Sequence, residues 1–341
     1  MGSEFGRVGI LMGGSSSERA ISLRSGMAAY HALTSLGIDC VSIDVVPDHA
    51  GFRKQIALAH IDVAFIALHG AFGEDGTAQT LLDQMHIPYT GSGAAASRCA
   101  IDKVASKYLF EEQGIVTPRA VVFNCELEST TGLERYTLGD IPGLLRGWGD
   151  VSGYVIKPAC QGSSIGVTMV REMTRIPEAI EKALAFGDRI VIEEMISGRE
   201  LTVGILEESA LPVIEVIPGS EFYDYDAKYS NRQTQYRVPA PLTPEEGRLI
   251  QGEALKAHRA LQCCGFSRVD LIYSLSGVPY ILEVNTIPGL TDRSLLPRAA
   301  EAQGVPFPEL CRRMLHAALR RHHTLTRLVA GGRLVFESPL S

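Results

Sequence analysis

Residues 268–285 read RVDLIYSLSGVPYILEVN, two apolar stretches separated by a serine–glycine turn. This pattern predicts two antiparallel strands joined by a turn. Side chains two residues apart in a strand project to the same face. Glu283 and Asn285 therefore point to one place, and Asp270 on the first strand can face them. A buried carboxylate is costly unless it is paired or binds a cation, so we expect a positive charge at this face.

Two interpretations of this polar face remain open. Oxygen ligands from two carboxylates and an amide suit magnesium, which usually shares its coordination shell with waters and substrate phosphates. The alternative is a solvated polar face without a ligand. The apolar neighbours on both strands favour the metal site, so the candidate metal ligands are Asp270, Glu283 and Asn285.

The composition is that of a globular protein with several domains. The chain has 341 residues, of which 45% are hydrophobic and 21% are charged, enough for two or three packed units. The net charge is -7 and the basic residues are scattered, so the charge pattern of a nucleic-acid-binding protein is missing. Small molecules are the expected partners.

The cysteines and the hydrophobicity profile predict the compartment. Seven cysteines are too few and too irregularly spaced for a disulfide framework, and no C-x-x-C or H-E-x-x-H spacing indicates a zinc site. No apolar run approaches the ~18 residues of a membrane span, and the N-terminus lacks the layout of a signal peptide. We therefore expect a soluble cytoplasmic protein with reduced thiols and no membrane partner.

Three successive units follow from the order of the expected elements. Up to about residue 90, short apolar strands alternate with helical stretches, the pattern of a parallel α/β sheet. Later strands form hairpins backed by helices, the pattern of α+β units. The predicted domains are 6–97, 98–187 and 188–323. The first five residues, MGSEF, resemble a cloning remnant, and residues 324–341 are expected to be a tail outside the domains and a candidate for disorder.

The stretch VIKPACQGSSIGV, residues 155–167, contains a candidate phosphate site. Pro158 keeps Lys157 extended, and the amides of the turn around Ser163 and Ser164 can wrap phosphate oxygens. The chain has no G-x-x-x-x-G-K-[ST] motif, so it is not a P-loop NTPase. A plain hairpin with a surface lysine fits these residues equally well.

Glu18 and His69 each follow an expected strand. Ser15 and Glu18 fit an S-x-x-E capping box, and the residues alone favour that interpretation, in which Glu18 only satisfies backbone donors. The alternative is an anion at the carboxyl end of a strand, where ligands of α/β sheets bind. His69 is equally consistent with a structural histidine and with a ligand contact.

A second nucleotide motif supports a different class of enzyme. TGSGAAASRC, residues 90–99, matches G-x-G-x-x-A, with Glu111 and Glu112 at a suitable distance for a dinucleotide ribose. That fingerprint should follow the first strand, whereas three strands are expected before it. An NAD-dependent dehydrogenase is therefore the weaker alternative.

Taken in chain order, seven motifs are GGSSSE, HGAFGEDG, IDK, VIKP..QGSSIGV, FYDYDAKY, SRVDL and LEVNTIPGLT..SL. In this order and spacing the chain resembles the D-alanine:D-alanine ligase family of ATP-grasp enzymes, from about Arg7 to His323. The resemblance implies an ATP-grasp fold, in which a parallel α/β domain is followed by two α+β subdomains that grip ATP. It also implies two Mg²⁺ or Mn²⁺ ions, with a monovalent cation left open.

The resemblance also implies roles for particular residues. The metal ligands of the family correspond to the same three residues of the hairpin. Its nucleotide contacts correspond to Lys103, Lys157, Ser163, Ser164, Glu193, Glu194, Ile196, Glu200 and Lys228. Its catalytic and substrate-binding residues correspond to Glu18, His69, Ser163, Tyr229, Arg268, Gly289 and Ser294.

The implied reaction joins two D-alanine molecules for peptidoglycan precursor synthesis. ATP converts the first D-alanine to an acyl phosphate, which the amine of the second D-alanine attacks. Arg268 and Gly289 would donate to the oxyanion. Glu18 and His69 would orient the first ammonium group, and Ser294 would bind the second carboxylate.

Residues 221–238 resemble the lid of the family, although a surface loop is the alternative. Lys228 would neutralise charge during phosphoryl transfer. Tyr229 matches the lid tyrosine of dipeptide-forming ligases, which D-lactate ligases generally lack, and would form a hydrogen-bonded clasp with Ser163 and Glu18. We therefore expect D-alanine as the second substrate, with D-serine harder to exclude.

Three positions depart from the family pattern, one of them Arg232 in SNRQTQY after the lid tyrosine. Glu194 stands where a lysine is frequent, and Leu290 replaces a common methionine of similar volume. A non-catalytic nucleotide-binding protein could keep the fold, but the intact Arg268 and Asp270 argue against it. The family further implies a bacterial cytoplasmic homodimer.

Overall fold

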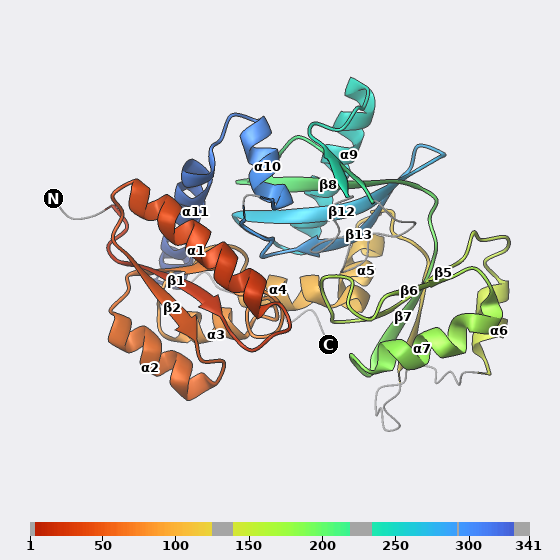
Figure 1. Ribbon diagram of the computed structural model, residues 1–341, viewed down its shortest axis with the longest axis horizontal. Helices are drawn as coiled ribbons and strands as arrows, with labels where there is room; N and C mark the ends of the chain where they lie inside the picture. Colours follow the sequence, from red (N-terminus) through yellow and green to blue (C-terminus); the bar gives the residue numbers. More distant parts are fainter. Residues whose placement is uncertain (1–3, 125–138, 219–233, 292, 331–341) are drawn as a thin grey trace.

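The structure, a computed structural model, describes residues 4–124, 139–218, 234–291 and 293–330. Figure 1 shows three packed units: an α/β unit at the N-terminal end, a large sheet in the middle and a smaller sheet at the far side. In the part of the chain that is described, no helix combines the length and apolar character needed to cross a membrane.

The N-terminal unit is a parallel α/β sheet, which confirms the prediction for this segment. Its strands pair in the order β2–β1–β3, all parallel, and α1 packs on β1. The middle strand β1 is buried at all six positions, as expected for a parallel strand covered on both faces. Its elements are β1 (Val8–Gly13), α1 (Arg19–Ser35), β2 (Cys40–Val45), α2 (His49–Ala59), β3 (Val63–Ile66), α3 (Thr77–Gln84) and α4 (Ala94–Ile101).

The dinucleotide fingerprint has the wrong context in this unit. Gly93 is the N-cap of α4, which follows β3 and α3 rather than β1. The motif therefore does not open the first helix of a dinucleotide-binding fold, and the dehydrogenase interpretation loses its structural basis.

The smaller sheet contains a strand that the sequence places elsewhere. Its order is β4–β7–β5–β6, and all its pairs are antiparallel. We predict β7 in the last unit, but β7 lies between β4 and β5, so sheet membership divides the chain after Glu194 and not at 187. The local pattern specifies a strand without specifying its partner. The elements are α5 (Lys103–Glu112), β4 (Ala120–Asn124), α6 (Ile141–Arg146), β5 (Tyr154–Pro158), β6 (Thr168–Val170), η1 (Met173–Arg175), α7 (Ile176–Leu184) and β7 (Arg189–Glu194).

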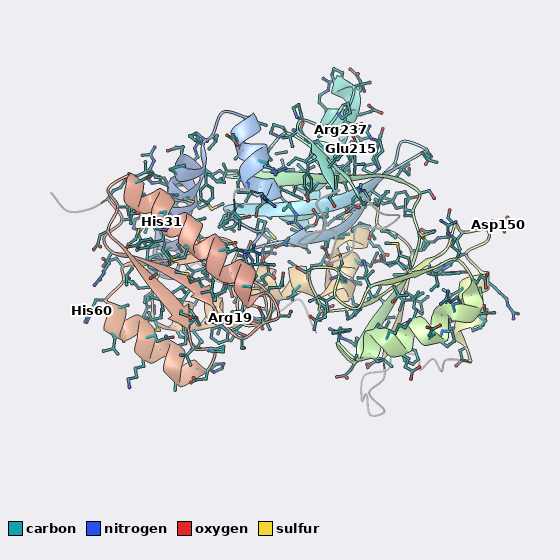
Figure 2. All side chains as sticks on the ribbon, viewed as in Figure 1. Arg19, His31, His60, Asp150, Glu215 and Arg237 are labelled. Carbon is teal, nitrogen blue, oxygen red and sulfur yellow. The ribbon has the colours of Figure 1, made fainter. Side chains whose placement is uncertain are left out.

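The large antiparallel sheet has the order β11–β10–β8–β12–β13, with β9 pairing with β8. Helix α9 packs its apolar side on this sheet, and its N-terminus has a complete capping box of Thr243 and Glu246. Glu215 and Arg237 face each other on β10 and β11, with charged atoms 3.3 Å apart (Figure 2). The elements are β8 (Gly198–Leu206), β9 (Ser209–Ala210), β10 (Ile214–Ile217), β11 (Gln235–Arg237), α9 (Pro244–Ala260), β12 (Phe266–Ser274) and β13 (Pro279–Asn285).

At both ends, the folded part of the chain extends beyond the domain boundaries that the sequence predicts. Helices α10 (Leu295–Ala302) and α11 (Phe307–Ala330) complete the structure, and α11 passes the expected boundary at His323. Phe5, which we assigned to a cloning remnant, is 3% exposed and packs edge-to-face on His316 of α11 with ring centroids 4.9 Å apart. The N-terminal boundary thus depends on packing of an aromatic ring against a distant helix, which local periodicity does not reveal.

Candidate active site

A cavity of about 1340 Å³ lies where the three units meet. Its walls come from α1, the loops after β3 and β5, the start of α5, the strands β8, β12 and β13, and the start of α10. The predicted site residues that line it are Glu18, His69, Lys103, Ser163, Glu200, Arg268, Asp270, Glu283, Asn285, Gly289 and Ser294.

Other predicted nucleotide contacts lie outside this cavity lining. Glu193 is buried in ion pairs with two lysines, one of which is Lys157. Glu194 is held by Arg119, whose guanidinium lies 2.6 Å from its carboxylate. Ser164 and Ile196 are not among the lining residues either. Lys228 and Tyr229, which we predict in the lid, lie outside the described residues.

The hairpin of β12 and β13 presents four polar side chains on one face. Arg268 pairs with Asn285, and Asp270 pairs with Glu283, so the register is the one that the sequence predicts. Asp270 accepts hydrogen bonds from the guanidinium of Arg268 at 2.6 and 2.9 Å and from the hydroxyl of Thr202 at 2.6 Å. Thr202, on β8, is a site residue that sequence reasoning missed because its strand is far away in the chain.

Lys103, at the start of α5, lines the cavity and contacts both the hairpin and the turn after β5. Its ammonium lies 3.3 Å from Glu283 and donates to the carbonyl of Gln161 at 2.7 Å. It is 6% exposed. Asp102 caps α5 through the amide of Val104 and also pairs with Arg189 at 2.6 Å. These contacts hold the start of α5 between the two antiparallel sheets.

The oxygen donors of the hairpin fit a divalent cation. Among the residues with described positions, no group of three His, Cys, Asp or Glu side chains gathers as a ready metal site. Asp270 and Glu283 supply two carboxylates and Asn285 an amide oxygen, and all three line the cavity. Mg²⁺ typically takes one or two carboxylates and completes its shell with waters and substrate phosphates. The donor set therefore suits an ion that arrives with a nucleotide.

Glu18 faces the cavity and does not cap its helix. It is the N-cap of α1 but makes no side-chain capping bond, so the capping-box interpretation is wrong. Its carboxylate instead accepts a short hydrogen bond from the hydroxyl of Ser163. Ser163 and Ser164 have φ of 52° and 59°, a left-handed conformation that is uncommon for residues with a side chain and occurs at ligand-binding loops.

His69 is a buried member of a hydrogen-bonded relay. Its Nδ1 lies 2.9 Å from the carbonyl of Ile287, which can only accept, so Nδ1 carries the proton. Its Nε2 lies 3.0 Å from the hydroxyl of Ser25, which donates to it and accepts from the amide of Leu290 at 3.2 Å. Burial lowers the pKa of His69, which keeps the ring neutral. No local pattern in the sequence singles out Ser25.

Glu74 is a second buried carboxylate that the sequence analysis did not select. It lines the cavity, is 9% exposed and accepts from the amide of Gly70 at 2.8 Å. Burial raises its pKa well above the usual range, and the charge of Glu18 adds to this effect. The available signal was its position in the HGAFGEDG turn that follows β3.

The N-terminus of α10 opens toward the same cavity. Ser294 is its N-cap and makes no capping bond within the helix. The Ser294 hydroxyl instead accepts from the amide of Thr291 at 3.0 Å. A Cβ on Gly289 would lie 2.8 Å from that hydroxyl oxygen, so a larger residue there would force Ser294 to move. Amides at a helix N-terminus bind carboxylates well.

Two antiparallel sheets that meet at a charged cavity, with a parallel α/β unit at its end, define an ATP-grasp enzyme. The family model described as D-ala D-ala ligase C-terminus matches residues 152–316, and the model for the N-terminus matches residues 45–92. A D-alanine–D-alanine ligase of Syntrophotalea carbinolica is 42% identical over 315 residues, covering 92% of this chain and 97% of that protein.

Solved structures agree with these sequence matches. The crystal structure of a D-alanine–D-alanine ligase from Bacillus anthracis has a TM-score of 0.80 at 32% identity, covering 94% of this chain and 99% of that chain. A second structure of that ligase, complexed with ATP, has a TM-score of 0.79 at 30% identity with the same coverage of both chains. The chain belongs to the D-alanine–D-alanine ligase family.

Proposed function

We propose that the chain catalyses the ATP-dependent ligation of two D-alanine molecules to D-alanyl-D-alanine. One observation carries this proposal: a single cavity brings together Arg268, the acidic hairpin, the Glu18–Ser163 contact and the N-terminus of α10. An amide-forming enzyme needs a site for a triphosphate, a site for an ammonium group and a site for a second carboxylate, and each is supported by a part of this wall.

The nucleotide would lie with its phosphates beside Lys103 and the turn at Ser163. Asp270, Glu283 and Asn285 would hold the divalent ions, which when bound neutralise charge on the phosphates. Lys103 is fixed next to Glu283 and adds a positive charge to this region. The solved complex of the Bacillus anthracis ligase with ATP supports ATP as the nucleotide.

The first step transfers a phosphoryl group to the first D-alanine. Its carboxylate oxygen attacks the γ-phosphorus, the bond to the bridging oxygen breaks, and ADP leaves. Glu18 supplies a buried carboxylate for the substrate ammonium group. Neutral His69 bonds to the carbonyl of Ile287 and holds the segment after β13 in place. Peptide bond formation needs this activation because a free carboxylate is a poor acylating group.

The second step forms the amide bond. The free amine of the second D-alanine attacks the acyl carbon, a proton leaves the nitrogen, and phosphate departs. Arg268, 14% exposed at its side chain, lies on the cavity wall where it can donate to the oxyanion. Ser294 and the amides of α10 would bind the second carboxylate.

The direct test measures phosphate release with ATP, Mg²⁺ and individual D- and L-amino acids. We expect turnover with D-alanine alone and none with L-alanine. D-serine or D-lactate is then added together with D-alanine near pH 7, and the products are identified by mass spectrometry. A mixed product as the main species would assign the enzyme to the D-alanine:D-serine or D-alanine:D-lactate type instead.

The assembly and the cations belong to the same proposal. We propose a cytoplasmic homodimer that requires Mg²⁺ or Mn²⁺. Light scattering of the purified chain checks the dimer, and a mass of one chain would contradict it. Chelation with EDTA should abolish phosphate release, and added Mg²⁺ should restore it.

A further inference from the structure

Outside the cavity lining, three charged side chains form a buried row across α5, β7 and β5. The ammonium of Lys107 lies 2.9 Å from one oxygen of Glu193, and the ammonium of Lys157 lies 2.7 Å from the other. Their side chains are only 6%, 2% and 8% exposed, in the order Lys107, Glu193 and Lys157. Two buried cations therefore share one carboxylate, and the row carries an excess positive charge. Its lysines lie on α5, which also carries the cavity residue Lys103, and on β5, which leads to the turn at Ser163.

The two lysines are held very differently. Lys107 donates to the hydroxyl of Thr117 at 2.7 Å and to the carbonyl of Pro118 at 2.8 Å, and its third contact is the ion pair. An ammonium group has three donors, so Lys107 is fully satisfied. Among the described residues, the ammonium of Lys157 has one contact partner, Glu193.

This asymmetry indicates which lysine can move. Lys157 stands at the end of β5, and the turn that follows carries Ser163 into the cavity. When Lys157 turns to an anion, it breaks one ion pair, and an isolated carboxylate in the interior would be strongly unfavourable. Glu193 is not isolated, because Lys107 stays in place.

We propose that Lys107 is a positioning residue of the nucleotide site, the permanent counter-ion of Glu193 that allows Lys157 to turn to a phosphate group of the bound nucleotide. This inference rests on the proposed function, in which Lys157 contacts the nucleotide. Burial would raise the pKa of the Glu193 carboxyl, but the charges of Lys157 and Lys107 outweigh burial and lower it. The carboxylate thus stays ionised and needs a counter-ion throughout.

A purely structural role makes a different prediction. If Lys107 only joins α5 to β7, its loss lowers stability without a specific effect on the nucleotide. If Lys107 releases Lys157, its loss leaves Glu193 dependent on Lys157 alone, and nucleotide binding must break that last pair. The affinity for nucleotide then falls, while the KM for D-alanine stays near its wild-type value.

The test measures binding of ADP with Mg²⁺ by calorimetry, together with the KM values for ATP and D-alanine. Lys107→Met should weaken ADP binding by about tenfold or more, a change of the size that the loss of one charge contact gives. Lys107→Arg keeps the charge and should bind ADP within about threefold of wild type. Lys182→Met, which removes an exposed ion pair with Glu178 on α7, is the matched control and should change nothing.

A double variant separates release of Lys157 from other effects. Glu193→Gln removes the carboxylate that retains Lys157, and because Glu193 is itself a predicted nucleotide contact, the single Glu193→Gln variant is the reference. In that background Lys107→Met should cost much less ADP affinity than it costs in the wild-type chain. Wild-type ADP affinity in folded Lys107→Met would overturn the inference. Equal losses of ADP affinity in Lys107→Met and Lys107→Arg, or purely additive losses in the double variant, would overturn it as well. If Lys107→Met does not fold, the Arg variant and the double variant decide by the same criteria. If the wild-type chain itself does not bind ADP with Mg²⁺, that result contradicts the proposed function. It does not bear on the separate roles of Lys107 and Lys157.

Discussion

Ser25 links the predicted histidine to the segment that would bind the oxyanion. Its hydroxyl bonds to Nε2 of His69 and to the amide of Leu290, next to Gly289. Ser25 is fully buried, so neither contact can be replaced easily by bulk water. One hydroxyl therefore supports both the ring of His69 and the glycine segment, while the carbonyl of Ile287 sets the tautomer of the ring.

We expect Ser25→Ala to lower the free energy of unfolding by about 1–3 kcal/mol, because it leaves buried polar groups without a partner. It should also lower kcat, since His69 and the segment at Gly289 lose their common support. Urea unfolding and phosphate release measure the two effects. Ser35→Ala, an exposed position at the end of the same helix whose hydroxyl bonds only to the carbonyl of Ala32, is the control. An unchanged kcat in Ser25→Ala would show that the relay does not support the site.

Glu283→Gln preserves the size of the side chain and removes its charge. The carboxylate lies 3.3 Å from Lys103 and is a proposed metal ligand, so we expect turnover to fall by at least about 100-fold. The rate of phosphate release at saturating ATP measures this turnover. Glu301→Gln, an exposed position on α10, should leave the rate unchanged. Full activity of Glu283→Gln would mean that the cation binds elsewhere.

At the scale of single elements, helix α9 carries a buried histidine that couples stability to pH. His258 is 0% exposed and its Nδ1 lies 2.7 Å from the hydroxyl of Ser267 on β12. Burial lowers the pKa of His258 to about 4, although the charge of Glu208 opposes this shift. The ordinary value in an unfolded chain is about 6.5.

Between these two values the unfolded chain binds a proton that the folded chain does not. The free energy of unfolding should therefore fall as the pH drops from about 6.5 to about 4, by up to roughly 3 kcal/mol from this group. Denaturant unfolding at several pH values measures the slope. His258→Gln should remove this part of the slope, whereas His31→Gln, at an exposed position on α1 (Figure 2), should keep it. An unchanged slope in His258→Gln would contradict the assignment.

On the scale of the whole molecule, the hydrophobic cores divide the protein into two bodies. One core contains residues of the N-terminal sheet together with residues of the large sheet and α11, such as Val8, Phe266 and Leu315. The smaller sheet has its own core, made of residues between Ile141 and Ile192. Two of its contacts to the other units are polar: Ser163 bonds to Glu18, and Arg189 pairs with Asp102.

A body with its own core and polar contacts can move against the rest. We expect ADP with Mg²⁺ to slow amide hydrogen exchange in β5, β6 and the turn between them by about tenfold or more, because a nucleotide that contacts both bodies stabilises them against local opening. Amides of β1 and β12, in the shared core, should change little. Equal protection of both bodies, measured by mass spectrometry, would contradict independent movement.

The sequence predicts much of this architecture because period and spacing are local signals. The hairpin of β12 and β13 has the predicted register, since alternation fixes which side chains share a face. The partner of β7 and the row of Lys107 and Glu193 depend on contacts between distant segments, which no local pattern encodes. Glu18 shows the same limit: its spacing favours a cap, and only the approach of the loop with Ser163 gives it another role.

The burial of Phe5 has a practical consequence for handling the protein. Its ring occupies the core shared by the N-terminal sheet and α11, and Glu4 lies 3.3 Å from the imidazole of His316. A protease site used to release an affinity tag therefore belongs upstream of Glu4, because trimming to Gly6 would empty an aromatic pocket and lower the yield of folded enzyme.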